Sequence, residues 1–584
     1  MNFLEQIDSF FSSAVSGLTG VAFEYVTLII RIILPLLAIL ILARCITSLL
    51  SEKYEGEEWG YLSLPNGSRI NLAHWENIIG RAKASDVYME YPTLSRTHAA
   101  VIRDDKGNWT VHDLESKAGI TVNGKPVHSS APIKSGDVIL LGGIELVFMA
   151  MTKEEEIEQA RWRQRPGRTI KPGLTLFLLT EFQILLGLQH CIAAGEELSI
   201  VIPISFAALI GVMWLCYIVT RAMKRVGFEI ETIAFFLCSI GMSVTATSTP
   251  SELYKQIALL VFGIVVFFVL GWFLRNLDRA KKTRWPIAAA GLLFLAVNLI
   301  LSERIFGAKN WITIAGVTFQ PSEFVKIAFI FAGTATLDRL FAKRNLILFI
   351  GFAAACVGAL ALMSDFGTAV VFFAAYLVIA FIRSGDFATI FLSVGGAAFA
   401  GVLAFTFKPY IASRFESWGK VWLYPHDGGY QQTRAMSAAA SGGLFGTGAG
   451  NGWLHKIVAA DTDLVFCVVS EELGLIIAVL SILAIVALAV FSVKSSETAR
   501  SSFYVIGACA AASILVFQII LNVLGSVDIL PFTGVTFPFI SKGGSSLIAC
   551  WGLLAFIKAA DTRQNASFAI KIPKQKRVKK TEEI

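Results

Sequence analysis

The apolar stretch Phe503–Gly525, FYVIGACAAASILVFQIILNVLG, decides the fold class of this chain. It is 23 residues long and contains no charged side chain, and about 20 apolar residues are enough for a helix to cross a bilayer. Similar runs lie near residues 26–43, 173–190, 198–219, 230–247, 254–273, 285–301, 322–338, 345–362, 366–382, 386–406, 464–490 and 544–560. The sequence therefore predicts a polytopic α-helical membrane protein with about 13 spans.

Composition and charge narrow the class further. Of the 584 residues, 55% are hydrophobic and 16% are charged, against about 25% charged residues in soluble domains, which excludes a disordered chain. The net charge of +7 alone would allow a nucleic-acid partner, but Lys and Arg gather in alternate loops and in the tail segment Lys574–Lys580. We therefore expect no nucleic-acid partner, and we expect the tail to contact anionic lipids.

Residues 52–150 differ in character from the rest of the chain. Short apolar or alternating runs are separated by the turn signals Asp104–Gly107, Asn123-Gly124 and Ser135–Asp137. Turn signals at this spacing are typical of a small β-sandwich. Because loops rich in Lys and Arg remain in the cytoplasm, we expect this β-domain and the C-terminus to be cytoplasmic and the N-terminus to lie outside.

Three motifs in the β-domain carry basic and hydroxyl side chains in a fixed order. They are Gly80-Arg81, Ser95-Arg96-Thr97-His98 and Ser116–Gly124. Arg, Ser and Lys on loops at one end of a sandwich can donate charge-assisted hydrogen bonds to a phosphate. The pattern resembles a forkhead-associated (FHA) domain, which binds phosphothreonine peptides.

The FHA resemblance implies roles for individual residues. Arg81 and Ser95 would hold the phosphate, Arg96 and Lys117 would assist, and His98 would brace the loop. Asn123 would complete the phosphopeptide-binding set. Ala118 occupies the position where the family usually has an Asn that grips the peptide backbone, so a domain that serves only as a docking platform is an alternative.

Polar residues also cluster within and between the membrane spans. Charged groups at membrane depth cost at least about 2.5 to 3.5 kcal/mol each, so they are functional candidates. The clusters are Gln320–Lys326 (QPSEFVK), Ser364–Thr368 (SDFGT), the outer segment from about Phe407 to Asp463 with Pro425–Gln431 (PHDGGYQ), and Leu530–Ser546. Structural alternatives are a helix cap with a salt bridge for Glu323 and Lys326, and an N-cap for Asp365.

These clusters, in this order and on one face, resemble the SEDS family of cell-wall polymerases (FtsW, RodA, SpoVE). The resemblance covers residues 228–562, which would form a ten-span core. It implies polymerisation of peptidoglycan glycan strands from lipid II, an undecaprenyl-pyrophosphoryl disaccharide-pentapeptide, in the bacterial plasma membrane. It also implies a class B penicillin-binding transpeptidase as partner. Departures from the family pattern are Ser364, Lys542, Asn310 and a short spacing between Asp427 and Tyr430.

The expected organisation follows from these assignments. The units are an N-terminal transmembrane anchor (1–50), the FHA domain (52–150), a charged linker (151–171), two extra transmembrane helices (172–220), the SEDS core (228–562) and a basic tail (563–584). The sequence leaves open whether the protein serves division, elongation or sporulation.

Asp427 is the predicted catalytic residue, because it matches the family's essential outer-loop carboxylate. Glycosyl transfer needs a base for the acceptor hydroxyl and positive charge for the departing pyrophosphate. The candidate substrate-binding residues are Lys309, Glu323, Lys326, Asp365, Arg414, Tyr430, Gln431, Asp463, Lys542 and Ser545. No cofactor or protein metal site is evident, although Mg²⁺ or Mn²⁺ could bind at the pyrophosphate.

Two other functions are compatible with the same features. Many spans with intramembrane carboxylates and broken outer loops also describe a flippase or transporter for lipid-linked precursors. A non-catalytic membrane scaffold built around the phosphopeptide-binding domain is the third interpretation. The polar clusters are predicted to lie only on the outer side. This position favours the polymerase, because a carrier needs access from both faces.

Overall fold

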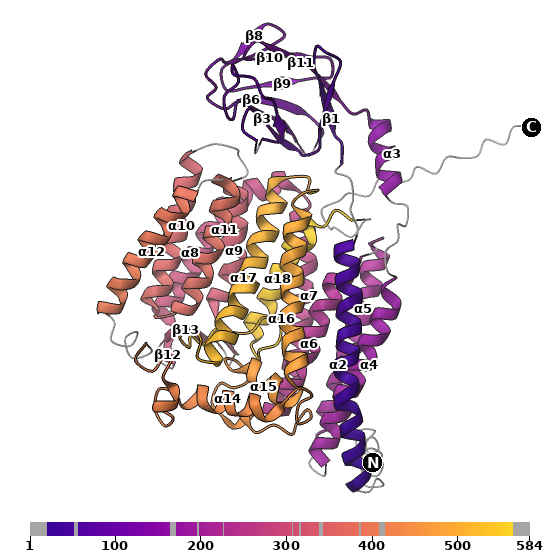
Figure 1. Cartoon of the computed structure of the whole chain (residues 1–584), viewed down its shortest axis with the longest axis vertical. Coiled ribbons are helices and arrows are strands. Elements are labelled where there is room, and N and C mark those ends of the chain that lie inside the picture. The colour runs from indigo at the N-terminus through magenta and orange to yellow at the C-terminus, as the bar shows by residue number, and fades with distance from the viewer. Residues whose placement is uncertain are drawn as a thin grey trace, which may run out of the picture.

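The computed structural model describes residues 20–51, 57–83, 85–104, 106–163, 171–195, 198–225, 227–305, 308–314, 317–337, 343–384, 387–407 and 415–563. A body of long helices carries a β-sandwich at one end, at the top of Figure 1. Short helices and a small sheet cover the opposite end.

The sandwich consists of two sheets that face each other across one apolar core. One sheet has the strand order β2-β1-β11-β10-β7-β8 and the other β4-β3-β5-β6-β9. The strands are β1 (Gly60–Ser63), β2 (Arg69–Leu72), β3 (Glu76–Gly80), β4 (Val87–Tyr88), β5 (Ala99–Arg103), β6 (Trp109–Asp113), β7 (Ile120–Val122), β8 (Lys125–Val127), β9 (Ser130–Ile133), β10 (Val138–Leu141) and β11 (Ile144–Ala150). Leu62 and Phe148 at its centre are fully buried. The predicted β-sandwich is confirmed.

The first half of the charged linker is helical. Helix α3 (Lys153–Arg163) begins directly after the sandwich. It is held there by an ion pair of 2.6 Å between Glu156 and Arg103 of β5. The segment that the sequence predicts only as a charged linker therefore begins as a helix that is tied to the β-sandwich.

Long apolar helices confirm the membrane class. Within the described part of the chain, nine helices are long and apolar enough to cross a membrane. They are α2 (Gly20–Ser51), α4 (Pro172–Ala194), α5 (Val201–Ala222), α6 (Glu229–Ser248), α7 (Leu253–Leu274), α8 (Leu277–Leu301), α10 (Lys343–Leu362), α16 (Leu475–Ser495) and α17 (Ser502–Ser526). Other apolar helices of the described chain are α9 (Pro321–Leu337), α11 (Phe366–Ser384), α12 (Phe387–Phe407) and α18 (Gly544–Ala560). The number of 13 spans stays a prediction.

Helices α2, α4 and α5 form a group beside α6, on the right of Figure 1. Polar side chains join this group to α6: Gln183 of α4 donates to Ser239 Oγ at 2.9 Å, and His190 lies 2.7 Å from Ser243 Oγ. Residues 229–246 of α6 are all buried as a result. Helix α4 thus supplies hydrogen-bonding partners for hydroxyl groups of α6 that would otherwise face lipid.

Two features at the end opposite the sandwich differ from the sequence prediction. The predicted span 464–490 is two helices, α15 (Val465–Glu472) and α16, which begins at Leu475. Gly474 between them has a φ of +90°, and a Cβ there would lie 2.3 Å from the carbonyl oxygen of Leu444. A three-stranded sheet of β12 (Glu303–Ile305), β13 (Ala308–Ile314) and β14 (Val317–Phe319) lies between the predicted spans 285–301 and 322–338, where the sequence analysis assigned no element.

Arg563 is the first residue of the segment predicted as a basic tail (563–584) and the only one of that segment among the described residues. Arg563 is buried and forms ion pairs with Asp561 at 2.8 Å and Glu229 of α6 at 3.4 Å. It therefore belongs to the helical body. The remaining tail, including Lys574–Lys580, lies outside the described residues.

The sandwich docks on the loop between α16 and α17. The main-chain N–H of Trp75 donates to the carbonyl of Arg500 at 2.6 Å. The Arg500 side chain forms an ion pair of 2.5 Å with Glu57 and lies 5.2 Å from the Trp59 ring centroid. The sandwich is thus held against the helical body by specific contacts in addition to its covalent connections.

Candidate active site

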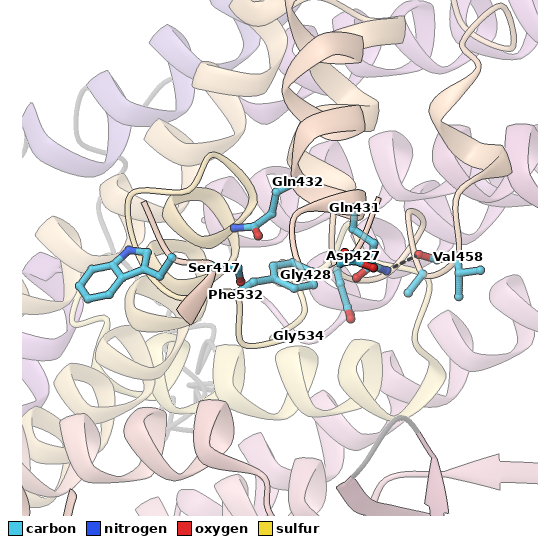
Figure 2. A pocket seen from close by; sticks show the side chains of 11 residues that line it. Ser417, Asp427, Gly428, Gln431, Gln432, Val458, Phe532 and Gly534 are labelled. Carbon is cyan, nitrogen blue, oxygen red and sulfur yellow. Dashed lines mark hydrogen bonds between the residues drawn. The ribbon is translucent and has the colours of Figure 1, made fainter. Parts of the chain in front are cut away.

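A cavity of about 310 Å³ lies at the end of the helical body opposite the sandwich. Its walls come from a turn before α14 (Tyr430–Gly442), from the segment before α15, and from the loop before α18 (Figure 2). The lining residues are Ser417, Trp418, Asp427, Gly428, Gln431, Gln432, Val458, Ala459, Asp463, Phe532 and Gly534. Of the predicted site residues, the structure brings Asp427, Gln431 and Asp463 together here.

Asp427 is fixed in the turn that leads into α14. Its main-chain N–H donates to the carbonyl of Tyr424 at 3.2 Å, and its own carbonyl accepts from the N–H of Tyr430 at 3.1 Å. The side chain lines the cavity beside Gln431, whose Nε2 donates to the carbonyl of Val458 at 2.8 Å (Figure 2). Main-chain hydrogen bonds thus fix the turn from which the Asp427 carboxylate faces the cavity.

The glycine pair after Asp427 serves the packing of this turn. A Cβ on Gly429 would lie 2.2 Å from the carbonyl oxygen of Val421, and one on Gly428 would lie 3.0 Å from the Ser417 side chain. Arg434 braces the same turn, since its guanidinium donates to the carbonyl of Pro425 and lies 4.1 Å from the Tyr430 ring centroid. Tyr430 itself does not line the cavity.

Asp463 forms the facing wall. Its N–H donates to the carbonyl of Ala459 at 2.8 Å, and a Cβ at Gly534 would lie only 3.1 Å from its Oδ2. A side chain at position 534 would therefore press on this carboxylate. Two carboxylates and two amide side chains, those of Gln431 and Gln432, share one cavity, an arrangement suited to a proton acceptor and to a hydroxyl-rich ligand.

A second group of predicted residues forms a buried cluster between α9, α11 and α18. Glu323 and Lys326 form an ion pair of 2.6 Å and are almost fully buried. Gln320 joins the other two members, because its Nε2 donates to Asp365 at 3.4 Å and its N–H donates to Ser545 Oγ at 3.4 Å. This cluster does not line the cavity of Asp427.

Asp365 and Glu323 also make the contacts expected if their roles are structural, a helix cap for Asp365 and a helix cap with a salt bridge for Glu323. Asp365 Oδ1 accepts from the N–H of Thr368 at 3.1 Å, as an N-cap of α11 does. Glu323 lies in the first turn of α9 and pairs with Lys326 three residues later. A role of this cluster in substrate binding stays a prediction.

The predicted cations whose side chains the structure describes, Lys326 and Lys542, do not line the cavity. Lys542 is paired with Glu252 at 2.9 Å and Asp461 at 3.4 Å. Lys309 lies on β13, but its side chain, like the whole of Arg414, is outside the described residues. Among the described residues that line the cavity there is no Lys or Arg.

The three motifs of the FHA domain meet at one end of the sandwich. The Lys117 N–H donates to Ser95 Oγ at 3.1 Å, and the Arg81 N–H donates to the Ser95 carbonyl at 3.1 Å. His98 is fully buried, accepts from the Ser95 N–H at Nδ1 (3.1 Å) and lies 3.1 Å from the Gly119 carbonyl through Nε2. It therefore braces both loops that carry the candidate phosphate ligands.

Asn123 is engaged in the structure of the sandwich. It precedes Gly124 in the β7–β8 turn, with φ values of +49° and +77°. Its amide donates to Asp137 at 2.9 Å and accepts from the N–H of Val138 at 2.9 Å. Both ends of the side chain thus secure the turn, and its contact with a peptide stays a prediction.

Several residues of the site were missed by sequence reasoning. Gln432 donates to the carbonyl of Gly525 at 2.8 Å, which ties α14 to the end of α17. Asn522 of α17 donates to the carbonyls of Asp463 and Val535. The available signal was an amide inside the uncharged run of α17, because polar groups within a span need partners.

A bundle of apolar helices with a carboxylate-lined cavity at one end and an FHA-type sandwich at the other defines a membrane protein of the SEDS class. The family model of the FtsW/RodA/SpoVE cell cycle proteins matches residues 213–566, and the FHA domain model matches residues 77–142. The chain belongs to the FtsW/RodA/SpoVE family and carries an FHA domain. The resemblance stated from the motifs is confirmed.

Named relatives are peptidoglycan glycosyltransferases. The chain is 29% identical over 327 residues to the peptidoglycan glycosyltransferase RodA of Mycobacterium tuberculosis, covering 52% of this chain and 69% of the relative. It is 32% identical over 351 residues to the probable peptidoglycan glycosyltransferase FtsW of Acinetobacter baylyi, covering 56% and 87%. A chain from a solved peptidoglycan synthase complex is 26% identical over 57% of this chain and 96% of its own length, with a TM-score of 0.49.

Proposed function

We propose that this protein polymerises peptidoglycan glycan strands from lipid II by an inverting glycosyl transfer. The observation that carries the proposal is the shared cavity of Asp427 and Asp463, in a chain whose named relatives are peptidoglycan glycosyltransferases. Asp427 takes the proton from the acceptor sugar hydroxyl. The hydroxyl oxygen then attacks the anomeric carbon of the lipid-linked donor, and the bond to undecaprenyl pyrophosphate breaks.

A divalent cation, Mg²⁺ or Mn²⁺, suits the oxygen donors of this cavity. Mg²⁺ is commonly held by one or two carboxylates together with substrate phosphates. The described residues themselves contain no cluster of three potential metal ligands. Asp463 is the residue that would hold the cation, which leaves Asp427 for the proton. When bound, the cation would neutralise charge on the departing pyrophosphate. Loss of polymerisation on adding EDTA, with recovery on adding Mg²⁺ or Mn²⁺, is the expected result.

The proposed orientation places the cavity outside the plasma membrane and the FHA domain and C-terminus in the cytoplasm. The support is that α14, whose first turn lines the cavity, lies at the end of the helical body opposite the sandwich (Figure 1), while basic loops favour the cytoplasm. All eight native cysteines are buried, so new ones at exposed positions can report sidedness. A membrane-impermeant maleimide should label Lys420→Cys in intact cells, and it should label Ser68→Cys only after lysis.

The proposed partners follow from the two ends of the molecule. A class B penicillin-binding transpeptidase would cross-link the strands that the core makes, and lipid II and undecaprenyl pyrophosphate would occupy the cavity. A phosphothreonine-containing protein or a Ser/Thr kinase substrate would bind the loops of Arg81 and Ser95. The full chain should bind a phosphothreonine peptide more tightly than the same peptide without phosphate, and equal binding would end this assignment.

The deciding experiment is polymerisation of fluorescent lipid II by the purified full chain with a transpeptidase partner. Asp427→Asn should reduce the rate by about 10² to 10⁴-fold, the usual contribution of a general base. Glu416→Gln is the matched control, because Glu416 is an exposed carboxylate outside the cavity. Activity unchanged by Asp427→Asn would remove the base assignment. No polymer with any partner would favour the transporter, which lipid II movement across vesicles would detect, or the scaffold.

A further inference from the structure

We propose that Asn522 is a positioning residue for the glycosyl transfer, and this inference rests on the function proposed above. Asn522 lies one turn before the end of α17 and is 2% exposed. Its Nδ2 donates to the main-chain carbonyls of Asp463 at 3.0 Å and Val535 at 2.8 Å. Asp463 and Gly534, the neighbour of Val535, both line the cavity. One amide therefore joins two walls of the candidate active site.

The chemistry of the side chain suits this task. A primary amide has two N–H donors on one nitrogen, and here two carbonyl oxygens from segments far apart in sequence lie within hydrogen-bonding distance of it. A leucine of similar size would leave both carbonyls without this donor, and a buried acceptor without a partner is unfavourable. The two walls would then separate or rotate to find other donors.

Other contacts limit that movement to the edge of the cavity. Ser541 Oγ donates to the carbonyl of Thr462 at 2.6 Å, and the Lys542 N–H donates to the carbonyl of Asp461 at 2.8 Å. These bonds hold the same two segments a few residues further from Gly534. Loss of the Asn522 amide should therefore leave the segments docked and release the part that carries the Asp463 carboxylate.

The same end of α17 also holds the wall of Asp427. Gln432, in the first turn of α14, donates to the carbonyl of Gly525 at 2.8 Å, and Gly525 lies three residues after Asn522. The wall that carries Asp427 and the wall that carries Asp463 are thus both hydrogen-bonded to the C-terminal end of α17. The position of Asp463 relative to Asp427 should therefore depend on Asn522. A misplacement of about 1 Å can cost about 10²-fold in rate.

The test compares Asn522→Leu with Gln518→Leu in the purified full chain with its transpeptidase partner. Gln518 is a buried amide one turn earlier on α17, and it contacts Thr536 Oγ1 at 3.4 Å without lining the cavity. We expect Asn522→Leu to lower kcat for lipid II polymerisation by about tenfold or more, with KM within about twofold of the wild type. The melting temperatures of the two variants should be similar. Equal kcat values for the two variants would overturn the proposal.

A second measurement separates this proposal from the proposed function. In Asn522→Leu, the amides of residues 459–464 and 534–536 should exchange with deuterium faster than in the wild type, while those of residues 541–542 stay unchanged. This readout needs no catalysis. If the wild type makes no polymer, the proposed function fails, and the exchange data alone show whether Asn522 holds the two walls. Unchanged exchange in residues 459–464 would refute the positioning role.

Discussion

The carboxylate of Glu76 accepts a hydrogen bond from the main-chain N–H of Ser502 at 3.0 Å. Glu76 is the first residue of β3 in the FHA domain, and Ser502 is the first residue of α17. The same carboxylate accepts from Ser501 Oγ at 2.8 Å. Negative charge near the N-terminus of a helix is stabilising because the first N–H groups have no partner within the helix. A strand of the sandwich thus caps a transmembrane helix.

Removal of this cap should loosen the first turn of α17. Glu76→Ala deletes both hydrogen bonds, and loss of a helix cap costs about 0.5 to 2 kcal/mol. We expect hydrogen exchange at Ser502 and Phe503 to accelerate by about 2- to 30-fold in the full chain. Glu145→Ala, an exposed carboxylate on β11, is the control. Equal exchange in both variants would show that the dock does not support the helix.

Substitutions in the ion pair of Glu323 and Lys326 can show whether this pair stabilises the fold or binds the substrate. Lys326→Met leaves a buried carboxylate without its cation, which typically costs about 3 to 5 kcal/mol. Thermal unfolding of the purified protein should show this loss, and the double variant Glu323→Gln/Lys326→Met should recover most of it. A double variant that folds but makes no polymer would assign the pair to the substrate.

The exposed pair of Lys255 and Glu252, 3.2 Å apart and also three residues apart in sequence, is the control. Exposed ion pairs contribute about 0 to 1 kcal/mol, so Lys255→Met should change the unfolding temperature little. A Lys326→Met variant as stable as Lys255→Met would contradict the expected cost of the unpaired carboxylate.

Gly474 should tolerate no side chain. Gly474→Ala forces an L-residue to a φ of +90° and places Cβ 2.3 Å from the Leu444 carbonyl oxygen. Gly419→Ala meets a similar φ of +71° but has nothing within 4 Å. The backbone alone costs about 1 to 3 kcal/mol, so thermal unfolding should show a clearly larger loss for Gly474→Ala. Equal losses would mean that the loop moves away at little cost.

Ala118→Asn should strengthen phosphopeptide binding. Ala118 is exposed between Lys117 and Gly119, where the FHA family usually has an Asn that grips the peptide backbone. One or two new hydrogen bonds of about 1 kcal/mol each correspond to about 5- to 30-fold tighter binding, which isothermal titration with a phosphothreonine peptide measures. Arg81→Ala in the same background should abolish binding. An affinity unchanged by Ala118→Asn would show that peptides bind in another way.

The parts of the fold that depend on local pattern were predictable from sequence. The span expected at 503–525 is α17, Ser502–Ser526, because an uncharged run of this length has few alternatives in lipid. The β7–β8 turn was marked by Asn123-Gly124, whose residues adopt the positive φ values that this turn requires. The break at Gly474 was missed, because hydropathy averages over the apolar residues on both sides of a single backbone conformation.

The candidate site was predictable only in part. Motif order led to Asp427 and Asp463, but their meeting in one cavity depends on α17 and on the loop before α18. The charge of Lys542 suggested a role at a diphosphate, whereas Glu252 and Asp461 pair with it. Such pairings arise between segments distant in sequence, so a list of cations cannot separate structural charges from those that meet a substrate.

The position of β3 has a consequence for recruitment. One end of this strand, Glu76, contacts α17, and the residue after the other end, Gly80, is Arg81 of the loops proposed to bind phosphate. Five residues of strand span about 16 Å. A phosphoprotein held by Arg81 would therefore be stationed at a fixed short distance from the helical body, with one copy for each chain. Once it is bound, its effective concentration beside the polymerase would be set by this geometry and not by its concentration in the cell.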